Sequence, residues 1–416
     1  MNGDIPRLSL GASATSEEIK RALNAAAAAN YPHVFELGSD HALLPHWTPE
    51  SLVASMPSLR RAYVSRSSPI FGPYHDVNRP MAKVHNMSAL HDYYEDDVRS
   101  ADFFAAGSLS HRYYSGEVDR DLPEPMLSAL QPLERVLIAR GPARASVNLW
   151  LGRAPVSAPC HFDGYENAVV QLHGAKRFLL APPSAWRALR PYPFLHPSHA
   201  QCQVTMNALL ESGADRHEIQ AIDLRRGDLL FIPPLWFHET IALASDQHNG
   251  SPFDGVIGVN GWVDGDEGEA AADLFSLPRP RPPQVRHTRD SKAAAAAALI
   301  CLLSQSSFGS TEGGVAALVK RIWAERYSSL DLREGPPPFD GCSGWRGDMR
   351  IWLQHLPAKE WANAVARHAE AKLAGSTRAS WLGNLAEYVV AERVGVGHVY
   401  AFWKELNACV DELDDV

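Results

Sequence analysis

The 416-residue sequence predicts an α+β protein whose core is a closed or double-sheet all-β unit. Two patterns lead to this prediction. Several short apolar strands, separated by turn residues, lie within residues 146–263, which is typical of an all-β domain. Beyond a proline-rich stretch at residues 278–283, apolar residues recur at helical spacing, which indicates a helical C-terminal region.

Residues 1–140 are predicted to extend this core with helices and strands. Thr15-Ser-Glu-Glu18 has the form of a capping box and begins an alanine-rich helix that ends near Ala29. Two strands and a further helix start are expected after it: residues 32–37, residues 62–65 and Trp47-Thr-Pro-Glu50.

Residues 87–140 are predicted to be mainly helical and irregular. We interpret three aromatic pairs in this stretch as core and loop anchors rather than as a substrate stack: Tyr93-Tyr94, Phe103-Phe104 and Tyr113-Tyr114. The stretch therefore receives no role in the predicted site.

The catalytic core is assigned to residues 141–275. A His173-Gly174 turn is expected to fold the chain into a hairpin, and Arg226-Gly-Asp228 is expected to be a tight turn. The other predicted strands are residues 146–151, 228–232, 239–243 and 256–263.

A linker is predicted at residues 276–294, followed by a helical dimerisation region at residues 295–416. One apolar stripe there consists of Trp361, Val365, Ala369 and Leu373, and a second consists of Val399, Trp403, Leu406, Val410 and Leu413. A lone helical appendage could scarcely bury the aromatic residues Trp361, Trp381, Trp403 and Phe402. We therefore expect a homodimer through these helices.

Composition disfavours several classes of protein. The formal charge of −9 disfavours non-specific nucleic-acid binding, because such proteins carry basic patches. Five cysteines without a CxxC pair indicate free thiols in a reducing compartment rather than disulfides or a zinc site. With no signal peptide and no apolar run of about 18 residues, we expect no membrane contact and a soluble intracellular protein, either cytoplasmic or nuclear.

The candidate metal ligands are His161, Asp163 and His238. On an extended chain, residues two apart point to the same side, so His161 and Asp163 would face one point in space. They would supply two-thirds of the 2-His-1-carboxylate triad that holds non-haem Fe(II). His238 fits as the ligand from another strand, because an aromatic-rich segment gives a polar ring little other reason to be present.

The triplet His-x-Asp is weak by itself, but longer segments around it resemble a known family. The chain is similar to the JmjC-type, cupin-fold 2-oxoglutarate oxygenases, and most of all to the asparaginyl hydroxylase that modifies hypoxia-inducible factor. This resemblance implies a double-stranded β-helix, or jelly-roll, core. It is carried by residues 158–167, 174–183, 192–197, 201–203, 227–233 and 259–262.

The resemblance also implies Fe(II), 2-oxoglutarate and O2 as the reaction's cofactor and co-substrates. Lys176 would pair with the remote carboxylate of 2-oxoglutarate, and Asn167 and Asn260 would line its pocket. Ala158 replaces a threonine that helps to bind this carboxylate in the related hydroxylase, so Ser157 is a candidate substitute. Asn148 and Trp150 are further candidates for lining the pocket.

The expected reaction is hydroxylation of a protein or peptide side chain, with conversion of 2-oxoglutarate to succinate. Tyr165, Trp236, Trp262 and the loop 244–254 would border the substrate cleft. Residues 236–265 contain neither lysine nor arginine, which favours a polypeptide over a nucleic acid.

Several alternatives stay open at this point. The same metal chemistry serves tRNA-base hydroxylation and N-methyl-lysine demethylation. A non-oxygenase cupin such as an isomerase is less favoured, because it has no need of Lys176. The non-enzymatic alternative is an inactive cupin-fold scaffold protein.

Overall fold

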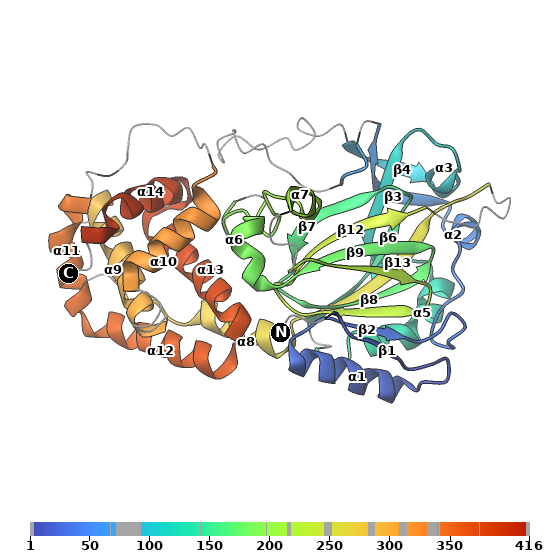
Figure 1. Cartoon of the computed structure of the whole chain (residues 1–416), viewed down its shortest axis with the longest axis horizontal. Helices are drawn as coiled ribbons and strands as arrows, with labels where there is room; N and C mark the ends of the chain where they lie inside the picture. Colours follow the sequence, from blue (N-terminus) through green and yellow to red (C-terminus); the bar gives the residue numbers. More distant parts are fainter. Residues whose placement is uncertain are drawn as a thin grey trace. The chain divides into compact units, whose positions relative to one another are not determined.

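The computed structural model describes residues 4–66, 68–71, 93–141, 144–196, 198–213, 218–244, 252–281, 288–307, 314–330, 339, 342–373 and 375–412 (Figure 1). Within these ranges the chain forms two compact units. The first contains the described residues up to 185 together with 204–268, and the second contains 186–203 and the residues from 269 onward.

The first unit is built on two β-sheets. A nine-stranded sheet within the described residues contains, in spatial order, β1 (Arg7–Ser9), β2 (His33–Glu36), β11 (Asp228–Ile232), β8 (Glu166–His173), β13 (Val256–Val263), β6 (Ala145–Gly152), β5 (His111–Glu117), β3 (Ser58–Ser65) and β4 (Tyr93–Arg99). A four-stranded sheet contains β10 (Gln220–Arg225), β9 (Ala175–Ala181), β12 (Phe237–Leu243) and β7 (Ser157–Phe162).

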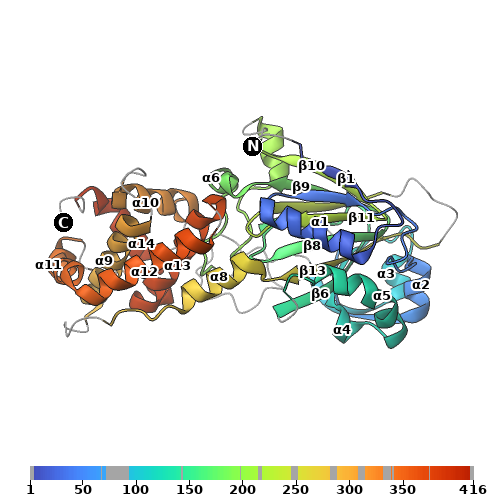
Figure 2. The ribbon, with the colours of Figure 1, turned by 90° about the horizontal axis from the view of Figure 1, so that it is seen from below.

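Apolar side chains from both sheets meet in a common interior, which includes Val169 and Leu230 from one sheet and Phe178 and Leu224 from the other. Helices cover the outer face of the larger sheet, and Figure 2 shows α1 and α5 there. The helices of this unit are α1 (Ser16–Ala29), α2 (Pro49–Ser55), α3 (Ser100–Phe104), α4 (Val118–Asp121), α5 (Glu124–Leu137) and α7 (Met206–Ser212). The predicted double-stranded β-helix core is therefore confirmed.

The N-terminal predictions hold up to β3. Helix α1 begins with the expected capping box, in which Thr15 and Glu18 each accept a backbone hydrogen bond from the other. The helical and irregular prediction for residues 87–140 is wrong for β4 and β5. Strand β5 pairs with both β3 and β6, so tertiary pairing decides its conformation where the local sequence has no clear strand period.

The expected hairpin at Gly174 is also wrong, although the turn itself is present. Strand β8 pairs with β11 and β13, whereas β9 pairs with β10 and β12. Gly174, with φ of +69°, therefore carries the chain from one sheet to the other. Gly227, at φ +92°, makes the second tight turn between the sheets, from β10 to β11.

The second unit is helical. Its helices are α6 (Trp186–Leu189), α9 (Arg289–Ser307), α10 (Gly314–Ile322), α11 (Cys342–Gln354), α12 (Leu356–Lys372), α13 (Gly375–Val394) and α14 (Val399–Cys409), with a π-helical turn at Trp323–Tyr327; α8 (Gly265–Ser276) spans the boundary between the units. Residues 293–303 of α9 are all buried, so this helix forms the centre of the unit.

The reason given for a dimer does not hold. Phe402 and Trp403 are fully buried within the single chain, and Trp361 is 6% exposed. Phe402 stacks on Trp345, and Trp403 lies beside Tyr327. The helical unit therefore buries Trp361, Phe402 and Trp403 by itself, whereas Trp381 is half-buried.

The cysteines differ in part from expectation. Cys160, Cys202 and Cys301 are buried thiols outside any disulfide, whereas Cys409 is disulfide-bonded, which corrects the expectation of thiols throughout. Among the described helices, none combines the length and the apolar character needed to cross a membrane.

Candidate metal centre and co-substrate pocket

The structure brings His161, Asp163 and His238 together. His161 lies on β7 directly opposite His238 on β12, and Asp163 follows the end of β7. One ligand atom from each residue lies within 4.8 Å of the others, and His238 Nε2 is 3.5 Å from Asp163 Oδ2. Two imidazoles and one carboxylate on one side of a point match the facial triad of non-haem iron sites.

Both histidines are oriented for metal binding. His161 Nδ1 lies 2.7 Å from the carbonyl oxygen of Pro159, and His238 Nδ1 lies 3.1 Å from that of Trp236. Because a carbonyl only accepts, each Nδ1 carries the proton and each Nε2 keeps a lone pair for a metal. Burial lowers the pKa of His238 to about 4, so its ring is neutral at physiological pH. These residues fit an iron ion.

A chain of buried amides supports the carboxylate. Asn167 Nδ2 donates to Asp163 Oδ2 at 3.3 Å, and Asn260 Nδ2 donates to Asn167 Oδ1 at 2.8 Å. Asn260 Oδ1 in turn accepts from Trp150 Nε1 at 2.6 Å and from Asn148 Nδ2 at 3.4 Å. The predicted asparagines therefore lie in one network that fixes the orientation of Asp163.

Lys176 lies in the same interior, on β9. Its ammonium is about 6 Å from the ring centres of Tyr113, Trp150 and Phe178. Burial lowers the pKa of Lys176 to about 8, and no carboxylate acts to raise it. A small cavity lies beside it, lined also by Gln171 and Ala242. A cation with no counter-charge among the described residues, beside a mostly apolar cavity, would fit the carboxylate of an acidic ligand.

Two polar residues of this pocket were not predicted as site residues from the sequence. Tyr113 lines the cavity from β5 and was interpreted only as a core anchor, because that strand was not predicted. Gln171 is 1% exposed; its Nε2 donates to the carbonyls of His173 and Ile257, while its Oε1 has no partner among the described residues. A lone amide in the apolar run of β8 was the signal that could have identified it.

The remaining predicted residues divide into two groups. Tyr165 is 45% exposed and stacks on Trp262, whose Nε1 is buried and finds no partner in the described part of the chain. Trp236 is not at an opening; its indole is 5% exposed and packs in the interior beside Tyr31, which corrects its assignment to the cleft border. Strand alternation turns Ser157 away from the face that Ala158 shares with Tyr113 and Trp150. In the loop 244–254, residues 245–251 lie outside the described residues.

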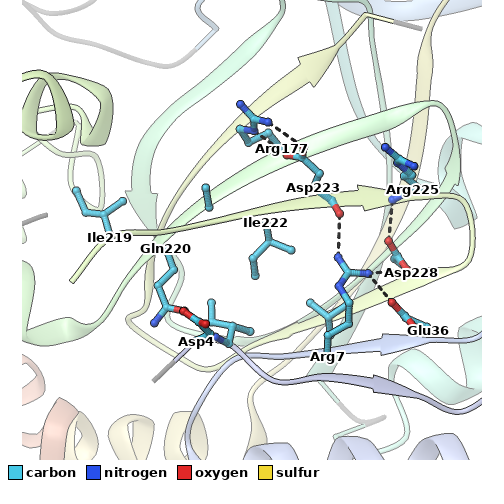
Figure 3. A pocket seen from close by; sticks show the side chains of 13 residues that line it. Asp4, Arg7, Glu36, Arg177, Ile219, Gln220, Ile222, Asp223, Arg225 and Asp228 are labelled. Atoms are coloured by element: carbon cyan, nitrogen blue, oxygen red, sulfur yellow. Dashed lines mark hydrogen bonds and ion pairs between the residues drawn. The ribbon is translucent and has the colours of Figure 1, made fainter. Parts of the chain in front are cut away.

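A larger groove lies elsewhere on the first unit and is unrelated to the metal ligands. It has a volume of about 830 Å³ and is bordered by β1, β2 and β10 (Figure 3). Two of the arginines that line it are in ion pairs: Arg7 pairs with Glu36 and Asp228, and Arg177 pairs with Asp223. The groove thus differs from the Lys176 cavity, where the cation has no counter-charge.

This combination of fold and site defines a class of protein. A double-stranded β-helix with two histidines and an aspartate gathered inside it is the architecture of a JmjC-type cupin oxygenase. The chain belongs to the cupin-like domain family, whose model matches residues 22–266.

Three relatives illustrate the range of this family. The chain is 31% identical over 100 residues to "Lysine-specific demethylase JMJ31" of Arabidopsis thaliana, covering 23% of this chain and 18% of that protein. It is 29% identical over 149 residues to human "Bifunctional peptidase and (3S)-lysyl hydroxylase JMJD7", covering 30% and 44%. It is 36% identical over 88 residues to "tRNA wybutosine-synthesizing protein 4" of Aspergillus oryzae, covering 20% and 8%.

The chain thus spans less than half the length of each of these relatives. Their names indicate different substrates, so the comparisons define the oxygenase class and leave the substrate open. The closer resemblance to the asparaginyl hydroxylase of hypoxia-inducible factor remains a prediction.

Proposed function

We propose that this protein is an Fe(II)- and 2-oxoglutarate-dependent dioxygenase that hydroxylates a side chain of a protein or peptide. One observation carries the proposal: the same barrel interior holds a two-histidine, one-aspartate cluster and a buried lysine that has no counter-charge in the part of the chain that the structure describes. A 2-oxo dicarboxylate satisfies both, because one end can bind a metal and the other can pair with the ammonium.

His161, Asp163 and His238 would hold the iron. The bound iron supplies the oxidation, in which O2, 2-oxoglutarate and a C–H bond of the substrate give succinate, CO2 and a hydroxylated product. Asn167 holds Asp163 through its Oδ2, and Asn260 holds Asn167. Lys176 pairs with the remote carboxylate, beside Tyr113 on the cavity wall.

A polypeptide substrate is supported by two observations. Tyr165 is exposed and stacks on Trp262, and residues 236–265 contain no cation to attract a phosphate backbone. The hydroxylase and demethylase relatives are named for lysine. The tRNA-related name keeps tRNA-base hydroxylation as the second candidate, and N-methyl-lysine demethylation as a third.

The decisive experiment compares the wild type with Asp163→Ala, given Fe(II), 2-oxoglutarate and a peptide library. We expect succinate and substrate masses raised by 16 with the wild type, and neither with the variant, which lacks the only charged ligand. Wild-type turnover by the variant would contradict the metal assignment. Oxidation of a tRNA nucleoside, with no peptide modified, would contradict the substrate class alone.

We retain the homodimer as a prediction that no longer has the exposed aromatic stripes as support. Sedimentation of the full chain tests it directly. A single monomeric species across a wide concentration range would refute it.

A further inference from the structure

The hydroxyl of Thr240 is buried without a hydrogen-bond partner in the described part of the chain. The residue is 5% exposed. Burying an unpaired hydroxyl costs free energy, so such a group persists at a cost unless something else satisfies it. The position of Thr240 indicates what that could be.

Thr240 lies on β12 between the metal end and the lysine end of the interior. The register of β12 with β9 is continuous over residues 237–243, so alternate side chains share one face. His238 is a metal ligand candidate on this face, and Ala242 on the same face lines the Lys176 cavity. The Thr240 side chain therefore points into the interior, between these two ends.

Thr240 and Lys176 are close neighbours across the sheet. Thr240 lies opposite Phe178 on β9, and Lys176 lies two residues before Phe178, opposite Ala242. Diagonal neighbours of this kind are about 7 to 8 Å apart at their backbones, within reach of a long side chain. The Lys176 ammonium also lies 5.8 Å from the ring centre of Phe178.

On the other neighbouring strand, the residue directly opposite Thr240 has no polar side chain. This residue is Ala158 on β7, which packs against the cluster of Phe71, Tyr113 and Val156. A ligand lying between the metal end and Lys176 would therefore meet a hydroxyl from β12 and only a methyl group from β7.

We propose that Thr240 binds the co-substrate by donating its hydroxyl hydrogen to the remote carboxylate of the 2-oxo dicarboxylate, beside the Lys176 ammonium. This inference rests on the proposed function and extends it to specificity. A hydrogen bond to a carboxylate is stronger than one between neutral groups, so the contact favours a dicarboxylate over a 2-oxo monocarboxylate.

The test uses the full chain loaded with Mn(II) in the absence of O2, so that the oxo acid binds without turnover. Calorimetric titration measures the Kd for 2-oxoglutarate and for pyruvate, which lacks the remote carboxylate. Thr240→Val should weaken 2-oxoglutarate binding about tenfold to one hundredfold and leave pyruvate binding unchanged. Thr240→Ser keeps the hydroxyl and should bind both acids like the wild type.

A hydroxyl transplanted to the neighbouring strand provides a rescue. Ala158→Thr combined with Thr240→Val should recover much of the 2-oxoglutarate affinity, whereas the matched Ala158→Val with Thr240→Val should not. Without oxo acid, Thr240→Val should have an unchanged or higher Tm, because it removes an unpaired buried hydroxyl. Thr240→Ala serves the same comparison if the valine variant does not fold.

Three outcomes separate this proposal from the proposed function. Wild-type binding of 2-oxoglutarate by Thr240→Val, with weakened binding by Lys176→Met, would overturn the role of Thr240 and leave the function standing. Equal weakening of both oxo acids would also overturn it, since Thr240 would then act at the metal end. No binding of 2-oxoglutarate by the wild type would overturn the proposed function itself.

Discussion

Two buried cations, one in each unit, have opposite surroundings. Arg326 in the helical unit is 2% exposed and donates to Glu387 Oε1 at 2.8 Å and to Asn384 Oδ1 at 3.0 Å. Its guanidinium also lies over the ring of Trp186. Lys176 in the barrel has three aromatic rings about 6 Å from its ammonium, and no carboxylate among the described residues raises its pKa.

We interpret Arg326 as a structural cation and propose Lys176 as a binding cation. Burying a charge is costly, and the fold of the helical unit offsets that cost for Arg326 with its own groups. The barrel leaves the cost uncompensated at Lys176, as is common where a ligand completes the site. Substitutions at Lys176, at Arg326 and at the partners of Arg326 test this comparison.

The largest expected effect is on co-substrate binding at Lys176. Lys176→Met should raise the Kd for 2-oxoglutarate by roughly 100-fold to 1000-fold, equivalent to about 3–5 kcal/mol, because the carboxylate is left unpaired. Titration of the Mn(II)-loaded protein measures this. Lys20→Met, which removes an ion-paired lysine on α1 in the same unit, is the control. An unchanged Kd would mean that another cation binds the carboxylate.

Replacing Arg326 should change the free energy of unfolding by a similar amount and should leave the affinity for 2-oxoglutarate unchanged. Arg326→Met leaves Glu387 buried without its cation and should lower the free energy of unfolding by about 3–5 kcal/mol. Denaturant unfolding followed by circular dichroism measures the loss, and 2-oxoglutarate affinity should not change. Adding Glu387→Leu should restore part of the stability. A loss below about 1 kcal/mol would show that the pair is not needed.

In the absence of metal and oxo acid, Lys176→Met should raise the free energy of unfolding, whereas Arg326→Met lowers it. Burial lowers the pKa of Lys176 from 10.5 to about 8, so the charged lysine destabilises the folded state. The variant should be more stable at pH 7 by on the order of 2–3 kcal/mol. Because the unfolded chain holds this proton up to a higher pH, the difference should persist below pH 8 and fade as the pH rises towards 10.5. A wild type more stable than the variant at pH 7 would contradict the comparison.

The smallest effect is expected from removing one neutral partner of Arg326. Asn384→Ala deletes the acceptor of one N–H bond but leaves the ion pair with Glu387, and should cost about 1–2 kcal/mol. The same unfolding measurement detects it. A cost as large as that of Arg326→Met would mean that the amide, not the carboxylate, stabilises the cation.

Sequence alone predicted which three side chains come together at the candidate metal site. The two-residue spacing of His161 and Asp163 and the isolated polar ring of His238 predicted a metal cluster, and the structure places the three together. The α1 capping box and the strand at residues 256–263 were also predicted correctly, because capping and strand formation depend on residues close together in the sequence.

Only the tertiary structure decided which strands pair and which side chains face each other. The crossing at Gly174, the existence of β5 and the neighbours of Thr240 depend on pairing between residues far apart in the sequence. Burial of Phe402 and Trp403 within one chain depends equally on helix packing. A local pattern indicates which interactions a side chain can make, whereas the fold determines which distant groups supply them.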